Sequence, residues 1–277
     1  MPLNIPTFLT RTGSAIVFAA IMLTGLLWNE WSFMILIVLI QFLCLNDYFR
    51  LMKLIDTKAA WSPWFLFFLQ ISGFVLISYT FLQNNAQSFL ITPLLFCIPA
   101  IIILLTAGGN GKNVIPVLLT FGGLLYISLP LGLFILLRNF SVQHFIPLAL
   151  VLLIWVNDTM AYITGSFLGR TPFSPASPKK TWEGTIGGIL FTVAVAIILF
   201  YLKLDRLRML DWIMLALCAS IAGTAGDLFE SKLKRLADVK DSGRLMPGHG
   251  GALDRFDSLL VAIPFAFICM FYIVWTI

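Results

Sequence analysis

Apolar residues fill most of this chain in long runs that are separated by short polar stretches. A helix needs about 20 apolar residues to cross the hydrocarbon core of a bilayer, and most of the runs approach that length. Because backbone groups inside lipid must satisfy their own hydrogen bonds, such runs predict transmembrane helices. The pattern predicts an all-α, polytopic integral membrane helix bundle of about nine transmembrane helices, at approximately residues 13–28, 31–45, 62–82, 89–107, 114–137, 145–165, 184–202, 212–229 and 258–277. The first two runs are short, so they could also form a tilted or partly buried hairpin.

Composition supports a membrane protein and excludes an ordinary soluble domain. Hydrophobic residues make up 60% of the sequence and charged residues 11%, whereas about 25% of the residues in soluble domains are charged. The four cysteines lie far apart in apolar runs, so we interpret them as small hydrophobic residues and not as metal ligands. They are Cys44, Cys97, Cys218 and Cys269.

Lysine and arginine residues concentrate on one side of the predicted membrane. Fourteen of them fall at the N-terminus or in every second loop after it, and four fall in the remaining loops. Since cytoplasmic loops carry the excess of positive charge, this bias predicts a cytoplasmic N-terminus and an external C-terminus. It also places the charged loops 166–183 and 230–257 on the cytoplasmic face, where nucleotides and Mg²⁺ are available.

One stretch, from Gly226 to Ser258, combines six acidic with six basic side chains. Carboxylates can hold a metal and cations can hold a polyanion, so this mixture indicates a site for both. The alternative is a solvated loop whose charges cancel one another. The charged residues are Asp227, Glu230, Lys232, Lys234, Arg235, Asp238, Lys240, Asp241, Arg244, Asp254, Arg255 and Asp257.

Two acidic residues, Asp158 and Asp227, fall inside predicted apolar segments. A carboxylate in lipid is costly unless it is paired or faces a wet cavity, so each predicts a functional site. The alternative is that both lie at the headgroup level, with the helices ending earlier. Helical spacing puts Asp227 on one face with three following polar residues, Glu230, Ser231 and Lys234. A face with carboxylates, a hydroxyl and an ammonium suits a metal-bound phosphate.

A glycine-rich turn, from Pro247 to Gly251, precedes the last apolar segment. Its glycines let backbone N–H groups approach a phosphate, and His249 can donate to an oxyanion. Asp254 and Asp257 follow at i, i+3, so we expect both carboxylates to point at one ion. Mg²⁺ favours such a site because it binds through a few carboxylates, water and substrate phosphates.

The other charged loop, 166–183, contains three prolines and several small residues. We expect it to be irregular, with Lys179 and Lys180 projecting from it. The two lysines could also be simple anchors to anionic lipid.

The run from Ser231 to Asp257 (SKLKRLADVKDSGRLMPGHGGALDRFD) closely resembles the signature of the bacterial phosphatidate cytidylyltransferase (CDP-diacylglycerol synthase) family. Residues 157–162 (NDTMAY) and 177–184 (SPKKTWEG) resemble a second region of that family. The resemblance covers about residues 155–258, and the first half of the chain is similar only as apolar spans. Met246, Ala252 and Ser166 depart from the family pattern, and at Ser166 one phosphate contact could be missing.

The resemblance implies an enzyme of phospholipid biosynthesis that converts CTP and phosphatidic acid into CDP-diacylglycerol and pyrophosphate with Mg²⁺. It also implies a second, monovalent cation such as K⁺, a homodimer, and a multi-pass protein of the cell inner (plasma) membrane. No nucleic acid is involved. We divide the chain into an N-terminal membrane-span region, 1–140, and a C-terminal catalytic membrane region, 141–277. With the resemblance we assign Asp227, Asp254 and Asp257 to the metal; Lys234, Arg235, Lys240, His249 and Arg255 to phosphates in catalysis; and Asp158, Lys179, Lys180, Ser231, Gly250 and Gly251 to substrate binding.

Three other functions fit parts of the pattern. A CTP-dependent polyprenol or lipid kinase would transfer the γ-phosphoryl group and release CDP. A CDP-alcohol phosphotransferase is disfavoured because its DGxxAR…GxxxD…D pattern is absent from the sequence. A transporter predicts charged residues in several spans and an inverted repeat, whereas the acids here cluster in the C-terminal half.

Overall fold

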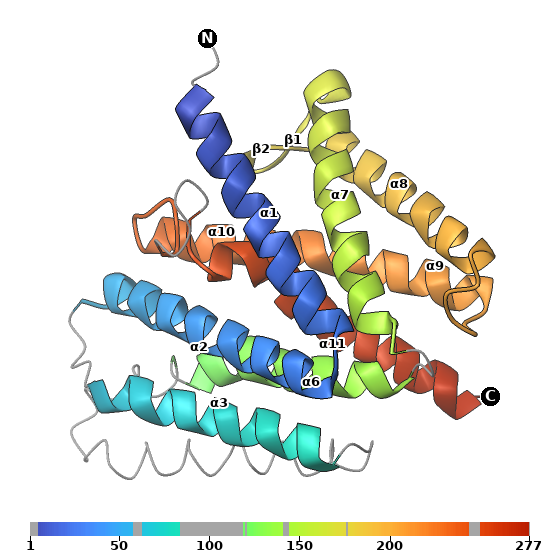
Figure 1. Cartoon of the computed structure of the whole chain (residues 1–277). Helices are drawn as coiled ribbons and strands as arrows, with labels where there is room; N and C mark the ends of the chain where they lie inside the picture. Colours follow the sequence, from blue (N-terminus) through green and yellow to red (C-terminus); the bar gives the residue numbers. More distant parts are fainter. Residues whose placement is uncertain are drawn as a thin grey trace.

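In the computed structural model of the protein, residues 5–57, 63–83, 119, 121–140, 144–175, 177–243 and 250–276 are described. This part of the chain is almost entirely helical (Figure 1). The α-helices are α1 (Ile5–Leu27), α2 (Glu30–Ile55), α3 (Pro63–Gln83), α6 (Leu129–Leu137), α7 (Ile146–Leu168), α8 (Trp182–Tyr201), α9 (Met209–Leu217), α10 (Gly223–Leu236) and α11 (Leu253–Thr276). Two π-helical turns extend them, η1 (Leu124–Ser128) before α6 and η3 (Cys218–Ala222) between α9 and α10.

The predicted fold class, an all-α membrane helix bundle, is confirmed. Within the described residues, seven helical segments are long and apolar enough to cross a membrane, and Thr12–Leu27 is a shorter apolar helix. The predicted span 89–107 lies outside the described residues, so the count of about nine stays a prediction.

Two predicted boundaries are wrong because polar residues continue the helices. The second segment runs past residue 45 to Ile55, and the segment predicted to end at residue 229 runs through η3 and α10 to Leu236. The first two helices are separate, since Asn29 caps α2 by accepting a hydrogen bond from the Ser32 N–H at 2.8 Å.

Helix α11 lies at the centre of the bundle. It contacts α6 and α2 on one side and α10, α9 and η3 on the other, and Figure 1 shows it passing behind α1 and α7. Leu260, Ile263 and Phe267 on this helix are almost fully buried. Any residue near the start of α11 is therefore held by packing from both halves of the chain.

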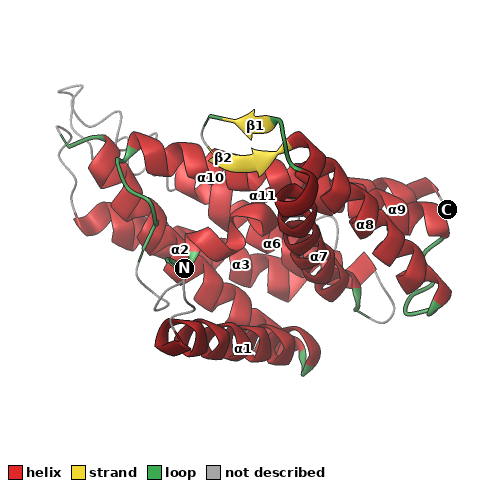
Figure 2. Cartoon of the chain, turned by 90° about the horizontal axis from the view of Figure 1, so that it is seen from above, coloured by secondary structure: helices red, strands yellow, loops and turns green. Residues whose placement is uncertain are grey.

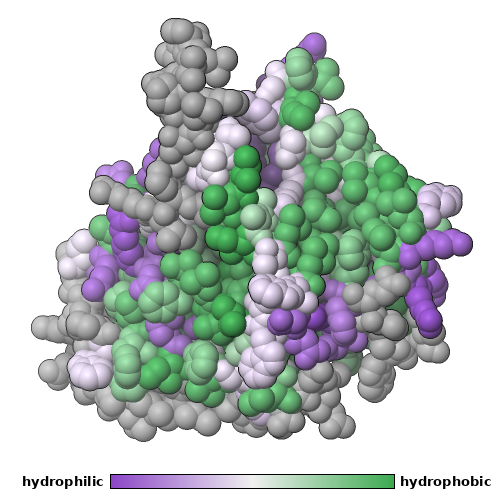
Figure 3. All heavy atoms as spheres, viewed as in Figure 1, coloured by the Kyte–Doolittle hydropathy of each residue, from purple (hydrophilic) through white to green (hydrophobic). Residues whose placement is uncertain are grey.

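The outer surface is apolar where lipid would contact it. On α8 the side chains of Ile186, Leu190 and Phe191 are exposed, and Figure 3 shows a broad apolar area on this face of the molecule. A soluble protein rarely exposes so large an apolar patch. The surface therefore agrees with an integral membrane protein.

The loop between α7 and α8 is a β-hairpin, so the prediction of an irregular loop is wrong. Strands β1 (Pro172–Ser174) and β2 (Ser177–Thr181) pair antiparallel, and Figure 2 shows the hairpin at the edge of the helical layer. The side chain of Glu183 closes its base by accepting hydrogen bonds from the N–H groups of Arg170 and Thr171, at 3.1 and 3.2 Å. These contacts depend on the start of α8, which the composition of the loop did not indicate.

Candidate active site

A pocket of about 750 Å³ opens between α7, the hairpin, α10 and the start of α11. It brings together segments that are far apart in the sequence, because α10 packs on α11 and α7 packs on α8. The pocket thus joins the two charged loops that the sequence placed on one face. Its charged and amide-bearing lining residues are Asn157, Asp158, Lys179, Lys180, Asp227, Lys234, Asp241, Asp254, Arg255 and Asp257.

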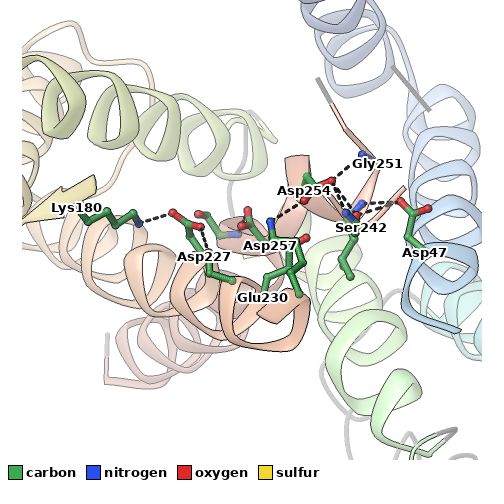
Figure 4. A network of polar contacts seen from close by, with 12 residues as sticks. Asp47, Lys180, Asp227, Glu230, Ser242, Gly251, Asp254 and Asp257 are labelled. Atoms are coloured by element: carbon green, nitrogen blue, oxygen red, sulfur yellow. Dashed lines mark hydrogen bonds and ion pairs between the residues drawn. The ribbon is translucent and has the colours of Figure 1, made fainter. Parts of the chain in front are cut away.

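Three carboxylates from α10 and α11 converge beside this pocket. Oxygen atoms of Asp227, Glu230 and Asp257 all lie within 4.8 Å of one another, and Figure 4 shows the three side chains as neighbours. The two helices can approach this closely because Gly226 lies directly on the Asp257 backbone, where a Cβ would collide.

These three side chains, Asp227, Glu230 and Asp257, form what we call the carboxylate group. It has the chemistry of a site for a hard divalent cation. Glu230 is fully buried and Asp257 is 7% exposed. Among the described residues, the Oε1 atom of Glu230 has no hydrogen-bond partner, which is unusual for a buried carboxylate. Mg²⁺ takes oxygen ligands at about 2.0–2.1 Å, so ligands on opposite sides of the ion lie about 4.2 Å apart. At least two of the three pairs must be neighbouring ligands, about 2.9 Å apart, so the carboxylates would close around the ion. Three carboxylates on two packed helices, one of them buried with an unpartnered oxygen among the described residues, fit Mg²⁺ by donor type.

Lys234 connects this group to a second acidic residue. Its ammonium lies 2.5 Å from Glu230 Oε2 and 2.6 Å from Asp254 Oδ1. The other oxygen of Asp254 accepts hydrogen bonds from the Ser242 N–H at 2.9 Å, the Ser242 hydroxyl at 2.9 Å and the Gly251 N–H at 2.7 Å. Asp254 thus holds the end of the glycine turn, and its contacts differ from those of Asp257 (Figure 4).

The hairpin reaches the carboxylate group through Lys180. This lysine forms an ion pair with Asp227, and Asp227 also accepts a hydrogen bond from the Ser231 hydroxyl at 3.3 Å. On α7, Asp158 also lines the pocket and is 3.5 Å from the amide nitrogen of the buried Asn157. A cation from one loop therefore lies directly at the acidic centre.

Some of the predicted site residues line the pocket and others do not. Arg235 and Lys240 are exposed and are not among the residues that line the pocket. Gly250 has a φ of +83°, which favours glycine. His249 lies outside the described residues. The predicted residues that line the pocket are Asp158, Lys179, Lys180, Asp227, Lys234, Asp254, Arg255 and Asp257.

Two functional candidates were not assigned from the sequence. Glu230 was placed on the helical face of Asp227 but was not counted among the metal ligands, although its spacing was a usable signal. Asp47, on α2, hydrogen-bonds with residues near the start of α11. About 200 positions separate it from these partners, so no local pattern could reveal it.

Comparison with known proteins relates the chain to one family over nearly its whole length. The model of the cytidylyltransferase family matches residues 9–273. The chain is similar to a phosphatidate cytidylyltransferase of Bacillus subtilis (strain 168), with 34% identity over 94% of each chain. It is 30% identical to one of Staphylococcus haemolyticus (strain JCSC1435), over 92% of this chain and 95% of that protein. A third, of Staphylococcus aureus (strain COL), is 35% identical over 69% of this chain and 64% of that protein.

Proposed function

The chain belongs to the cytidylyltransferase family, and from this membership we propose that it is a phosphatidate cytidylyltransferase. In this reaction CTP and phosphatidic acid give CDP-diacylglycerol and pyrophosphate. The observation that carries the proposal is one pocket that Asp227 and Asp257 line together with cations from the hairpin, α10 and α11. The relatives over most of the chain are named for the same activity.

This reaction requires that the phosphates be positioned and their charge neutralised, and it does not require a strong base. An oxygen of the lipid phosphate attacks the α-phosphorus of CTP, the bond from that phosphorus to the bridging oxygen breaks, and pyrophosphate leaves. The second pKa of a phosphomonoester is about 6, so the nucleophile is already anionic near neutral pH. Catalysis of phosphoryl transfer then depends on holding the reactants in line and stabilising their charge.

We assign the cations of the pocket to the phosphate groups. Lys179 and Lys180 on the hairpin and Arg255 on α11 line the pocket. Each is able to neutralise phosphate charge as it accumulates on the leaving group. Lys234 also lines the pocket, but its two close contacts are with carboxylates. We therefore assign Lys234 to the ordering of Glu230 and Asp254.

We assign Asp227, Glu230 and Asp257 to a bound Mg²⁺. When bound, the ion supplies positive charge to the phosphates of the nucleotide. The three side chains are held from two packed helices. Asp254, which the sequence assigned to the metal, is instead proposed to hold the glycine turn through Ser242 and Gly251.

We also propose that the pocket faces the cytoplasm, with the N-terminus inside and the C-terminus outside. The excess of basic residues on that side supports this orientation, and so does the meeting of both predicted cytoplasmic loops at one pocket. The monovalent cation and the homodimer stay predictions from the family resemblance.

The experiment is a product analysis with purified protein in detergent. Phosphatidic acid, CTP and Mg²⁺ together should release pyrophosphate, and omission of either substrate should abolish the release. CDP-diacylglycerol should form in equal amount, as measured by mass spectrometry. Release of CDP in place of pyrophosphate would contradict the proposal and support a CTP-dependent lipid kinase.

A further inference from the structure

An acidic residue from the N-terminal half reaches the edge of the site. The Oδ2 atom of Asp47, on α2, accepts a hydrogen bond from the Leu253 N–H at 3.2 Å and lies 3.5 Å from the Ser242 hydroxyl. Figure 4 shows its side chain pointing from α2 toward Ser242. Leu253 is the first residue of α11. Asp47 therefore supplies an acceptor to a helix N-terminus whose N–H groups have no partner within the helix.

Two glycines show how closely Asp47 approaches the backbone. A Cβ added to Gly243 or to Gly251 would collide with the Asp47 carboxylate. These glycines flank the segment 244–249, which lies outside the described residues. One side chain from α2 thus contacts the chain on both sides of that segment. A carboxylate that served only to satisfy its own hydrogen bonds would not require glycine at both of these positions.

The contact continues from Asp47 to the carboxylate group of the pocket. The Ser242 hydroxyl, which lies 3.5 Å from Asp47, donates its proton to Asp254 at 2.9 Å. Asp254 in turn pairs with Lys234, and Lys234 pairs with Glu230. A chain of polar contacts therefore joins α2 to the buried acid on α10.

The location of the partly buried Asp47 also argues for a specific role. It lies on a helix that is long and apolar enough to span a membrane, where a carboxylate is costly unless it has partners. Its neighbour Asn46 donates within α2, to the Phe42 carbonyl at 2.7 Å. Helix α2 packs against both α10 and α11, so its position and theirs are coupled.

We propose that Asp47 is a positioning residue for the reaction at the pocket. It fixes the backbone at Ser242–Gly243 and at Gly251–Leu253, and so sets where the first turn of α11 presents Arg255 and Asp257. Its effect on turnover rests on the proposed function, whereas its effect on the backbone does not. The N-terminal half then serves as part of the active site's support as well as a membrane anchor.

The test compares Asp47→Ala and Asp47→Asn with Tyr48→Phe. The control removes another contact between α2 and a distant residue, the hydrogen bond from the Tyr48 hydroxyl to the Leu119 carbonyl. Neither residue lines the pocket. Hydrogen–deuterium exchange is followed in a peptide that covers residues 250–255. Asp47→Ala should speed exchange there at least about tenfold, whereas Tyr48→Phe should leave it unchanged. Asp47→Asn should fall between them, because its amide oxygen can still accept from Leu253.

Kinetics separate positioning from general loss of folded protein. A smaller folded fraction lowers the maximal rate at unchanged KM, whereas a displaced α11 should raise the KM for CTP by about tenfold in Asp47→Ala. Unchanged exchange in both Asp47 variants would overturn the proposal, and so would faster exchange with an unaltered KM for CTP. If the unaltered protein forms no CDP-diacylglycerol, the proposed function fails, and the exchange data still decide whether Asp47 fixes this backbone.

Discussion

Removal of the Lys234 ammonium should destabilise the protein strongly. The Lys234 side chain is 14% exposed, and its partners Glu230 and Asp254 are 0% and 8% exposed. At the 2.6 Å distance between Lys234 and Asp254, two unit charges attract by about 6 kcal/mol at an effective dielectric constant of about 20. Desolvation offsets much of this attraction, and breaking a buried pair typically costs about 3–5 kcal/mol. For a chain of this size we expect Lys234→Met to lower Tm by about 6–20 °C.

The assay is thermal unfolding in detergent, with Lys232→Met as the matched control. Lys232 is exposed on the same helix, so its loss should change stability by no more than about 0.5 kcal/mol. Adding Glu230→Gln to Lys234→Met should recover part of the lost stability, because one unpaired carboxylate becomes neutral. Equal melting temperatures for Lys234→Met and Lys232→Met would refute the view that this lysine binds two buried acids together.

Three further predictions follow from the site and its surroundings. Glu230→Gln should raise the Mg²⁺ concentration at half-maximal turnover about tenfold or more, since a loss of about 1.4 kcal/mol in metal affinity is a tenfold change. A Mg²⁺ titration of pyrophosphate release measures this concentration, and an unchanged midpoint would remove Glu230 from the metal site. Gly251→Ala should abolish turnover because its Cβ would collide with Asp47 and Ser242, whereas Gly13→Ala, where a Cβ meets nothing within 4 Å, should be neutral; activity in both variants would contradict the close packing. A Ser177→Cys variant of the cysteine-free protein should react with an impermeant thiol reagent only after cells are permeabilised, and labelling in intact cells would reverse the proposed orientation.

Local sequence patterns predicted the parts of the site that lie on one helix. The spacing of Asp227, Glu230, Ser231 and Lys234 places them on one face of α10, and the contacts Ser231–Asp227 and Lys234–Glu230 confirm that face. Apolar run length likewise predicted the membrane bundle. One feature depends on the helical period and the other on the length of apolar runs, and a sequence displays both directly.

Spacing did not predict which partner each acid meets. Asp254 and Asp257 are three residues apart, yet Lys234 and Ser242 contact Asp254, while Asp227 and Glu230 approach Asp257. The difference comes from tertiary packing, because α10 lies against both acids while Ser242 contacts Asp254. The hairpin and Asp47 were missed for a related reason. Each is held by tertiary contacts, through Glu183 in one case and across about 200 positions in the other.

The central claim is tested most directly by the fate of labelled phosphorus. Purified protein is given phosphatidic acid and Mg²⁺ with CTP labelled either at the α- or at the γ-phosphorus, and the lipid and water-soluble products are separated. The account predicts that the lipid gains the α-label and that the γ-label leaves in pyrophosphate. It also predicts that Asp257→Asn, folded by its melting curve, gives neither product. Transfer of the γ-label to lipid, or full activity of Asp257→Asn, would contradict the account.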